Sequence, residues 1–423
     1  MLIEFSVANF MSFKERQTFS MVASKNKELE ETHTFVAPIS GGRDSTRLLR
    51  SAAIYGANAA GKTNIVFAIS AMQQMVTKSA AEKLQGERLK LMIPFKLDSK
   101  KRNEPSEFEM HFIVGGVRYQ YGFAGNEERF LEEWLISFPR GRARRWFDRT
   151  WNRKTKKYEW SFSPSFKGEK DLWKKSTREN ALFLSTAVHL NSEELRPLYD
   201  WFRNNEYLSQ QAQQDPDASA RSCTEGEKEK ILEFLKSADL DIHDVLVKMK
   251  EFDHDMLPGN MSEEVKKAIL KEMEGAKITE LKAVHLDNTG QPVSIDWGHE
   301  SSGTQKMFSL AAFWLSVLEK NRVVFLDELH GHLHTALVKF LVARFHNGQS
   351  NPNNSQLIFT THETALLNQK FLRRDQIWFC EKNEEKATKV YPLTDFHPRK
   401  GRENLELGYI SGVYGAVPYV REG

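Results

Sequence analysis

Cysteine is scarce in this chain of 423 residues: only Cys223 and Cys380 occur, and they lie far apart. That usage excludes a disulfide framework and fits a reducing, cytoplasmic compartment best. Long apolar runs are also missing, since the longest nearly unbroken one, residues 310–318, is far too short to span a bilayer. The N-terminus has Glu4 and no basic region, so we expect neither a signal peptide nor a membrane segment.

Glycine and proline are not abundant, with 24 and 13 residues, and apolar residues make up 40% of the chain. These values exclude a collagen-like or a disordered chain. The length suits either about two or three domains or one large α/β domain with insertions.

The net charge of +3 is small, but charge is unevenly distributed. Residues 140–178 hold 14 Lys and Arg against 4 Asp and Glu, with eight aromatic residues among them, whereas residues 204–290 hold 11 against 19. A basic surface with stacking aromatics is typical of nucleic-acid binding, and an acidic protein surface is another candidate partner. The alternative is a β lobe whose aromatics pack inward while its basic side chains are solvated. The alternation of Tyr158, Trp160 and Phe162 favours packing for those three.

A glycine loop between an apolar stretch and a helical pattern matches the phosphate-binding sequence G-x-x-x-x-G-K-[ST]. Glycines let the backbone N–H groups face the phosphates, and the helix that follows directs its positive end at the anion. Lys62 is expected to contact the β and γ phosphates of ATP, and the hydroxyl of Thr63 to bind Mg²⁺. The predicted nucleotide-binding loop comprises Gly56, Ala57, Asn58, Ala59, Ala60, Gly61, Lys62 and Thr63.

A second motif is the predicted strand 322–327, whose apolar residues lead into Asp327 and Glu328. A buried parallel strand delivers such carboxylates to the ligand-binding edge of a sheet. Asp327 is expected to hold Mg²⁺, and Glu328 to orient or deprotonate the water that attacks the γ-phosphate. His362 follows the next predicted strand, 356–360, and is expected to contribute to catalysis at the same edge.

A serine-glycine segment precedes a helical pattern with an apolar face over 306–318. A serine at a helix start is first of all an N-cap, which satisfies free backbone N–H groups. The same N–H groups and hydroxyls also suit a second phosphate contact. Ser301, Ser302 and Gly303 are therefore candidate nucleotide-binding residues.

The order of phosphate loop, serine-glycine segment, Asp-Glu strand and histidine strand resembles the ABC-type ATPase heads of the RecF, SMC and OLD group. The sequence is more closely similar to the RloA and AbiL-type ATPases of bacterial phage-defence and abortive-infection loci. The matching segments are 94–98, 300–305, 375–379 and 409–418. This resemblance implies a dimer, or a higher homo-oligomer, whose heads sandwich ATP and Mg²⁺. The serine-glycine segment of one chain would contact the nucleotide held by the other.

The resemblance also implies an output. Such proteins are Mg²⁺-dependent ATPases of slow turnover that act as sensors and regulate a companion effector in antiviral defence. A RecF-like DNA-repair ATPase that binds DNA directly is the alternative. An OLD-like nuclease is disfavoured, because only about 40 residues follow Phe379 and they contain no D-x-D cluster.

Several features distinguish this chain from those ATPases. Met11 stands where their opening usually has arginine, so any nucleotide or DNA contact from that side chain is lost. The usual glutamine loop has its best match at 187–191, which lacks glutamine, so His189 is a candidate replacement and otherwise an ordinary polar residue at a helix start. Three alternate histidines follow Glu328, and the last of them fits the dimer-contact loop of such heads, with a transition-metal site as the alternative. These histidines are His330, His332 and His334.

Strands that alternate with helices in the second half predict a largely parallel sheet, and alternating aromatics from 108 to 162 predict an antiparallel lobe. We therefore expect an α/β fold: an ABC-type P-loop ATPase head with an antiparallel β lobe and an inserted helical segment. The expected divisions are 1–93 for the N-terminal half of the head, 94–180 for the β lobe, 181–278 for an acidic helical insertion and 279–423 for the C-terminal half. Further expected elements are helices over 226–237 and 262–274 and a hairpin turn at 287–290.

Overall fold

The computed structural model describes residues 1–39, 46–209, 212–251, 257, 261–272, 277–399 and 401–418. The chain forms two compact units. The first comprises Met1–Ser209, Val317–His330 and Leu341–Gly423, and the second comprises Gln210–Ser316 and Gly331–Phe340. The segment 181–278 is thus divided between the two units.

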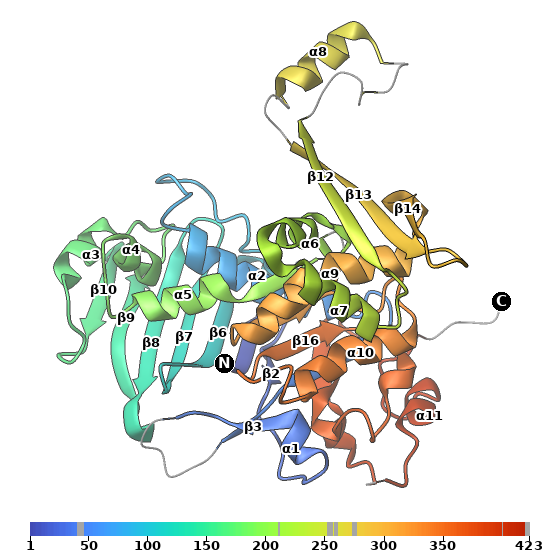
Figure 1. The fold of residues 1–423 in the computed structure, drawn as a ribbon. Helices are drawn as coiled ribbons and strands as arrows, with labels where there is room; N and C mark the ends of the chain where they lie inside the picture. The colour runs from blue at the N-terminus through green and yellow to red at the C-terminus, as the bar shows by residue number, and fades with distance from the viewer. Residues whose placement is uncertain are drawn as a thin grey trace. The chain divides into compact units, whose positions relative to one another are not determined.

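The first unit contains a seven-stranded antiparallel sheet in the order β10-β9-β8-β7-β6-β1-β2 (Figure 1). Its strands are β1 (Leu2–Ala8), β2 (Gln17–Ser20), β6 (Ser106–Val114), β7 (Val117–Gly125), β8 (Phe130–Phe138), β9 (Arg144–Asn152) and β10 (Lys157–Phe162). Gly115 and Gly116 join β6 to β7 with φ angles of 56° and 75°, which suit a tight hairpin because glycine has no Cβ to clash there. The predicted antiparallel lobe is confirmed, and it also takes up two strands from the N-terminus.

A six-stranded sheet, in the order β11-β15-β16-β5-β17-β18, forms the other layer of the first unit. Its strands are β5 (Ser51–Gly56), β11 (Glu206–Leu208), β15 (Val323–Leu326), β16 (Gln356–Thr360), β17 (Ile377–Lys382) and β18 (Thr388–Pro392). All pairs are parallel except that between the last two strands. Every residue of β5, β15 and β16 is buried, as expected for parallel strands covered on both faces. The expected α/β fold with an antiparallel lobe is confirmed by this arrangement.

Helix α2 (Lys62–Lys78) connects the packing of the two sheets. Its Ile65 and Met72 belong to the same buried cluster as Phe5 of β1 and Phe325 of β15. Burying one such side chain contributes about 1.5–3 kcal/mol to stability. The helix that begins at the phosphate loop is therefore fixed by the core that both sheets share.

A buried carboxylate positions the helix after the antiparallel lobe. Glu133 of β8 is fully buried and accepts hydrogen bonds from the backbone N–H groups of Phe183 (2.6 Å) and Leu184 (3.0 Å). These groups open α4 (Phe183–His189), where an anion is favourable. Arg149 of β9, also fully buried, lies 3.6 Å from Glu133 and compensates its charge.

The second unit contains the three-stranded antiparallel sheet β12-β13-β14 and helices on its flanks. Its elements are α6 (Asp217–Ser222), α7 (Lys228–Ser237), β12 (Asp244–Glu251), α8 (Glu263–Glu272), β13 (Lys277–Leu286), β14 (Pro292–Asp296) and the first part of α9 (Ser302–Glu319). Helices α7 and α8 lie where helices were predicted, although residues 273–276 fall outside the described part of the chain. The predicted hairpin turn joins β13 to β14, where Gly290 has a φ of 79°.

The expectation of a helical segment here is incomplete, because β12 and β13 form a long antiparallel pair. Val245 faces Ala283 across this pair and both are buried, whereas Leu246 is 38% exposed. Lysines and glutamates occupy many of the remaining positions. They obscure the period-two pattern by which a strand is recognised in a sequence.

The other elements of the first unit surround the two sheets. They are α1 (Glu30–His33), β3 (Thr34–Val36), β4 (Arg47–Leu49), α3 (Lys170–Ser176), α5 (Arg196–Asn204) and α11 (Leu405–Ile410), with α10 (Thr335–His346) shared between the units. Within the described ranges, no helix combines the length and the apolar character needed to cross a membrane.

Two buried histidines stack beside the N-terminal end of β5. The rings of His33 and His346 lie 3.6 Å apart between centroids, and His346 Nε2 lies 2.8 Å from the hydroxyl of Ser51. Burial lowers the pKa of His33 to about 4 and lowers that of His346 well below its ordinary value. Both imidazoles are therefore neutral in the folded protein at neutral pH.

We predict that this pair makes the protein sensitive to acid. Because the unfolded chain takes up protons near the ordinary pKa of 6.5 and folded His33 only near 4, stability is constant above about pH 6.5 and falls between these values. The loss attributable to His33 is on the order of 3 kcal/mol. Thermal unfolding of His33→Asn at pH 7.5 and 5.0 should show a smaller pH dependence than the native protein. His397→Asn, at an exposed histidine, should leave the pH dependence unchanged.

Candidate nucleotide-binding site

The phosphate loop turns at two glycines that no other residue can replace without displacing a neighbour. A Cβ on Gly56, at the end of β5, would lie 2.4 Å from the carbonyl oxygen of Cys380. A Cβ on Gly61, which has a φ of 107° and precedes α2, would lie 2.3 Å from the hydroxyl of Thr388. The two glycines therefore allow the backbone to turn sharply and to pack closely against its neighbours. A loop that wraps an anion requires both.

Side chains distant in sequence support this loop from outside. The hydroxyl of Thr388 donates to the carbonyl of Ala60 at 2.8 Å and also contacts Ser12 at 2.8 Å. The amide of Asn64 donates to the Ser12 hydroxyl at 2.7 Å. Sequence patterns indicate neither Ser12 nor Thr388 as part of the site, because both contacts arise only when the N-terminal strands and β18 meet the loop.

The predicted phosphate-contacting lysine points back into the loop. Lys62 Nζ donates to the carbonyl oxygens of Gly56 (2.9 Å) and Ala57 (3.0 Å). Burial lowers the pKa of Lys62, while the neighbouring Cys380, Glu328 and Asp327 raise it. A partly desolvated ammonium held inside a ring of backbone groups gains most from an anion bound next to it. The residues present therefore fit the phosphates of a nucleotide.

Asp327 and Thr63, which the sequence proposes as Mg²⁺ ligands, are brought together. The hydroxyl of Thr63 lies 3.2 Å and 3.1 Å from the two carboxylate oxygens of Asp327. The hydroxyl of Thr360, at the end of the adjacent strand β16, donates to Asp327 Oδ1 at 2.7 Å. Hydroxyl and carboxylate oxygens are the ligands that Mg²⁺ prefers, so this donor set fits the metal.

Glu328 follows directly in a strained backbone conformation. Its φ is 53°, in the left-handed region that costs a non-glycine residue about 1 kcal/mol or more. Its backbone N–H donates to the Thr360 hydroxyl at 2.7 Å, and the N–H of Leu329 donates to the Thr360 carbonyl at 3.2 Å. Thr360 therefore fixes both carboxylate residues, a role that the sequence alone did not indicate.

His362 lies just beyond β16 and lines a cavity next to the phosphate loop. Its ring is 5.5 Å from that of His330, and burial together with the charge of Lys62 and the neighbouring His330 lowers its pKa. The cavity has a volume of about 360 Å³. It is lined by Gly56, Ala57, Asn58, His362, Thr364, Tyr409, Ile410, Val417 and Pro418. A neutral imidazole is thus available beside the loop to contact a phosphate or a water.

The serine-glycine segment lies in the second unit. Ser301 caps α9, because its hydroxyl accepts from the backbone N–H of Thr304 at 3.0 Å. Ser301 and Ser302 are exposed, and Lys306 donates to the carbonyl of Gly331 at 2.6 Å. Ser301 is therefore the N-cap of α9, and Ser301 and Ser302 remain exposed within their own unit.

A profile of the family described as “AAA domain, putative AbiEii toxin, Type IV TA system” matches residues 51–368. The chain belongs to this family. The matched region of this AAA-domain ATPase begins with β5 and contains the phosphate loop, Asp327, Glu328 and His362. The geometric site and the family match thus fall on the same part of the chain.

Two solved structures are similar to this AAA-domain protein at low identity. The SMC head domain from Thermotoga maritima has 13% identity and a TM-score of 0.41, covering 92% of this chain and 98% of that one. A structure of the recombination mediator protein RecF in the RecFOR pathway has 13% identity and a TM-score of 0.37, with the same two coverages. A comparison with curated proteins gives no match.

The remaining histidine candidates have separate local roles. His189 is exposed at the end of α4, not at a helix start, and its ring lies 5.8 Å from that of Tyr199. His330 Nδ1 lies 3.3 Å from the Thr361 hydroxyl, whereas His334 Nδ1 accepts from the backbone N–H of Ala336 at 3.2 Å. Among the residues that the structure describes, no three histidine, cysteine or acidic side chains are grouped as metal ligands.

The aromatic side chains of the basic stretch 140–178 are buried or half-buried. They pack on one another and on α4: the rings of Trp160 and Phe162 lie 5.3 Å and 5.5 Å from that of Phe183. Exposed basic residues lie at both ends of the nine-residue strand β9, about 30 Å apart along the sheet, and also in and before α3, at Lys167, Lys174 and Lys175. The interpretation of inward-packed aromatics with solvated basic side chains describes this stretch.

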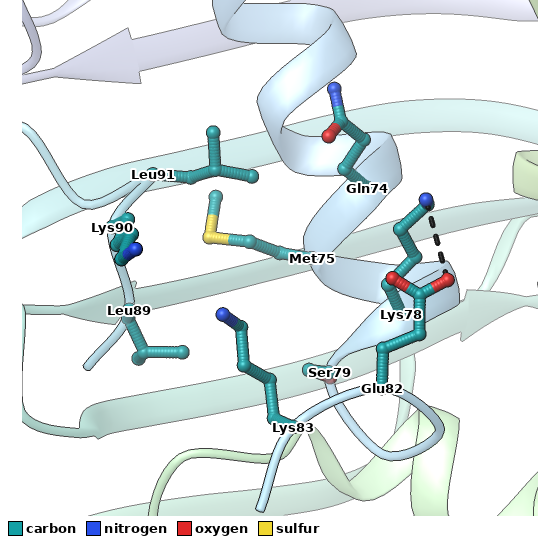
Figure 2. Close-up of a pocket in the computed structure, with 9 residues that line it drawn as sticks. All are labelled: Gln74, Met75, Lys78, Ser79, Glu82, Lys83, Leu89, Lys90 and Leu91. Carbon is teal, nitrogen blue, oxygen red and sulfur yellow. Dashed lines mark ion pairs between the residues drawn. The ribbon is translucent and has the colours of Figure 1, made fainter. Parts of the chain in front are cut away.

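A second cavity of about 210 Å³ lies at the other end of α2, and Figure 2 shows the side chains around it. It is lined by Gln74, Met75, Lys78, Ser79, Glu82, Lys83, Leu89, Lys90 and Leu91. Lys78 pairs with Glu82 at 3.3 Å, and lysines at a helix C-terminus favourably offset its dipole. The 17 residues of α2 separate this cavity from the phosphate loop by roughly 25 Å. We do not assign the nucleotide to it.

We predict that Thr360→Val weakens both the fold and Mg²⁺-dependent nucleotide binding. Valine keeps the shape of the side chain but removes the hydroxyl. The N–H of Glu328 and one oxygen of Asp327 then lose their hydrogen-bond partner, which lowers the free energy of unfolding by about 1–3 kcal/mol. Denaturant unfolding and nucleotide titration with and without Mg²⁺ measure the two effects. Thr186→Val is the matched control, since that buried hydroxyl donates only to the carbonyl of Leu182 within α4. Equal Mg²⁺ dependence in both variants would contradict the role of Thr360.

Proposed function

We propose that this protein is an ABC-type ATPase that binds and hydrolyses ATP with Mg²⁺ between two copies of its head. The observation that carries the proposal is the approach of the Thr63 hydroxyl to within 3.1 Å of the Asp327 carboxylate. Two motifs from distant parts of the sequence thereby bring a hydroxyl and a carboxylate together next to a phosphate loop, which supports a Mg²⁺ site there. A loop that bound only an inert anion would not need this pair.

Each residue has a defined task in the proposed reaction. Lys62 and the loop N–H groups would bind the phosphates, and Thr63 and Asp327 would hold Mg²⁺, whose charge would stabilise the phosphoryl group during transfer. Glu328, fixed through its backbone, orients or deprotonates the attacking water. His362, held neutral by its surroundings, donates a hydrogen bond on the γ-phosphate side.

The proposed assembly is a homodimer with two composite sites. Ser301 and Ser302 are exposed at the capped start of α9, where N–H groups and hydroxyls suit the nucleotide held by a second copy. ATP bound across such an interface stabilises it, so that occupancy and dimer closure are linked. Hydrolysis then opens the dimer.

The proposed biological role is a cytoplasmic sensor that regulates a companion effector in anti-phage defence or abortive infection. The RloA and AbiL-like segments of the sequence support it, as does membership in a family whose description names a toxin of a type IV TA system. A RecF-like ATPase that binds DNA directly is the second candidate. If the protein is a RecF-like ATPase, we expect strongly salt-dependent DNA binding. If it regulates an effector, we expect a protein complex that forms only with ATP.

We predict that Glu328→Gln retains ATP binding and loses hydrolysis by roughly a hundredfold to ten-thousandfold, as loss of a general base does. Glutamine can still hydrogen-bond the water but cannot remove its proton. Because ATP then stays bound, the variant should accumulate as a closed dimer in size-exclusion chromatography with ATP and Mg²⁺. Lys62→Ala, which removes a phosphate contact, should neither bind ATP nor form that dimer. Turnover of Glu328→Gln near the native rate would show that this carboxylate is not the base.

We further predict that the serine-glycine segment acts on the nucleotide of the other chain. Lys62→Ala and Ser302→Arg should each be inactive alone. Mixed in equal amounts, they should regain about a quarter of native activity, because half of the dimers are mixed and each has one intact site. The control is a mixture of Lys62→Ala with Glu328→Gln. Its mixed dimers have no intact site, because each chain brings a substituted residue to the site formed by its own phosphate loop. If the Lys62→Ala and Ser302→Arg mixture is inactive although it contains mixed dimers, the serine-glycine segment acts only as a helix cap.

A further inference from the structure

The C-terminal segment 405–418 packs directly on the nucleotide site. It comprises α11 and the turns after it, and four of its side chains form one wall of the cavity beside the phosphate loop. The opposite wall consists of the loop itself and the residues that follow β16. No motif of the proposed ATPase machinery accounts for this segment.

One polar contact joins the segment to the wall of the site that carries His362. Glu406 accepts a hydrogen bond from the hydroxyl of Thr364 at 2.7 Å, two residues beyond His362. The buried hydroxyl of Tyr409 donates to the carbonyl of Ala416 at 3.2 Å, and Tyr409 lines the cavity together with Gly56. One helical turn thus lines the cavity beside the phosphate loop and contacts the segment that carries His362.

The strand before the loop completes this arrangement. Tyr55, directly before Gly56, donates its hydroxyl to the carbonyl of Glu363 at 3.0 Å. Its ring packs against that of Tyr409 with 5.6 Å between centroids. His362 is therefore followed by two residues that are anchored on different sides, Glu363 to β5 and Thr364 to α11.

The segment is built to hold its shape. A Cβ on Gly408 would lie 2.8 Å from the ring of Tyr414, and one on Gly415 would lie 2.9 Å from both the carboxylate of Glu381 and the hydroxyl of Tyr391. Close packing of this kind leaves no room for the chain to shift. The segment therefore acts as a fixed support and not as a loose tether.

We propose that residues 405–418 form a clamp that positions the phosphate loop and His362 for hydrolysis, with Tyr409 and Glu406 as its positioning residues. The proposal rests on the ATPase function above and adds two positioning residues to the same site. Neither side chain reacts. Tyr409 packs on Tyr55 before the loop and holds the cavity wall that faces it, and Glu406 fixes the segment beside the imidazole, so that the clamp governs turnover more than nucleotide binding.

The first test compares two tyrosines. Tyr409→Phe should lower kcat for ATP about tenfold and change KM by less than about twofold, because it releases the carbonyl of Ala416, and with it the cavity wall that follows, and leaves the phosphate contacts in place. Tyr199→Phe is the matched control: its side chain is likewise buried and its hydroxyl donates to a backbone carbonyl, that of Thr77 at 2.8 Å, but it contacts neither the loop nor the clamp. An unchanged kcat in Tyr409→Phe, or equal losses in both variants, would overturn the proposal.

The second test uses rescue by a conservative side chain. Glu406→Gln can still accept the hydrogen bond from Thr364 and should keep most of the native kcat. Glu406→Ala cannot, and should lose turnover about as Tyr409→Phe does. Equal losses in the Gln and Ala variants would show that a charge, and not the anchoring of Thr364, is what matters.

Hydrogen exchange separates failure of the clamp from failure of the ATPase function. Backbone amides of residues 56–63 and 362–364 should exchange faster in Tyr409→Phe than in Tyr199→Phe, whether or not ATP is hydrolysed. If the native protein shows no more turnover than Lys62→Ala, the ATPase function is wrong while the exchange result still tests the clamp. Unchanged exchange in Tyr409→Phe overturns the clamp alone.

Discussion

The nucleotide site depends above all on where the carboxylate of Asp327 is held. It faces the hydroxyls of Thr63 and Thr360, which lie 264 and 33 positions away in the sequence. Both contacts require β5, β16 and β15 to lie side by side in one register, with Leu326 opposite Phe359. A slip of one residue would turn these side chains to the other face of the sheet. The buried apolar strands therefore do more than stabilise the fold, because they set the distances within the site.

The site is also mechanically connected to the antiparallel lobe. Helix α2 starts at the phosphate loop and buries its apolar side chains in the core shared by both sheets. Ser12, which follows β1, contacts both Asn64 and Thr388. A movement of the loop when phosphates bind must therefore be matched by the packing of α2 and of the N-terminal strands. Close-packed interiors transmit such displacements and do not absorb them.

Local sequence patterns predicted much of this structure, but they could not predict contacts between residues that are far apart in the sequence. The phosphate loop and the Asp-Glu strand are continuous in sequence, so residue types and spacing sufficed for both. The supporting hydroxyl of Thr360 could have been found only from the adjacency of two strands. Strand β12 was missed because charged residues interrupt its alternation. For the stretch 140–178, composition indicated the solvated charge, but only the structure shows that Trp160 and Phe162 pack against α4.

The position of β5 within its sheet has a consequence for synthesis. Its neighbours β16 and β17 belong to the C-terminal part of the chain, so an emerging phosphate loop has no strand beside it for about 300 residues. At roughly 5–20 residues per second, the ribosome needs on the order of 15–60 seconds to supply them. The antiparallel lobe, built from hairpins between neighbouring strands, can form during that interval. A nascent chain thus reaches a nucleotide-competent state only after β16 and β17 have emerged, which keeps a half-made ATPase inactive.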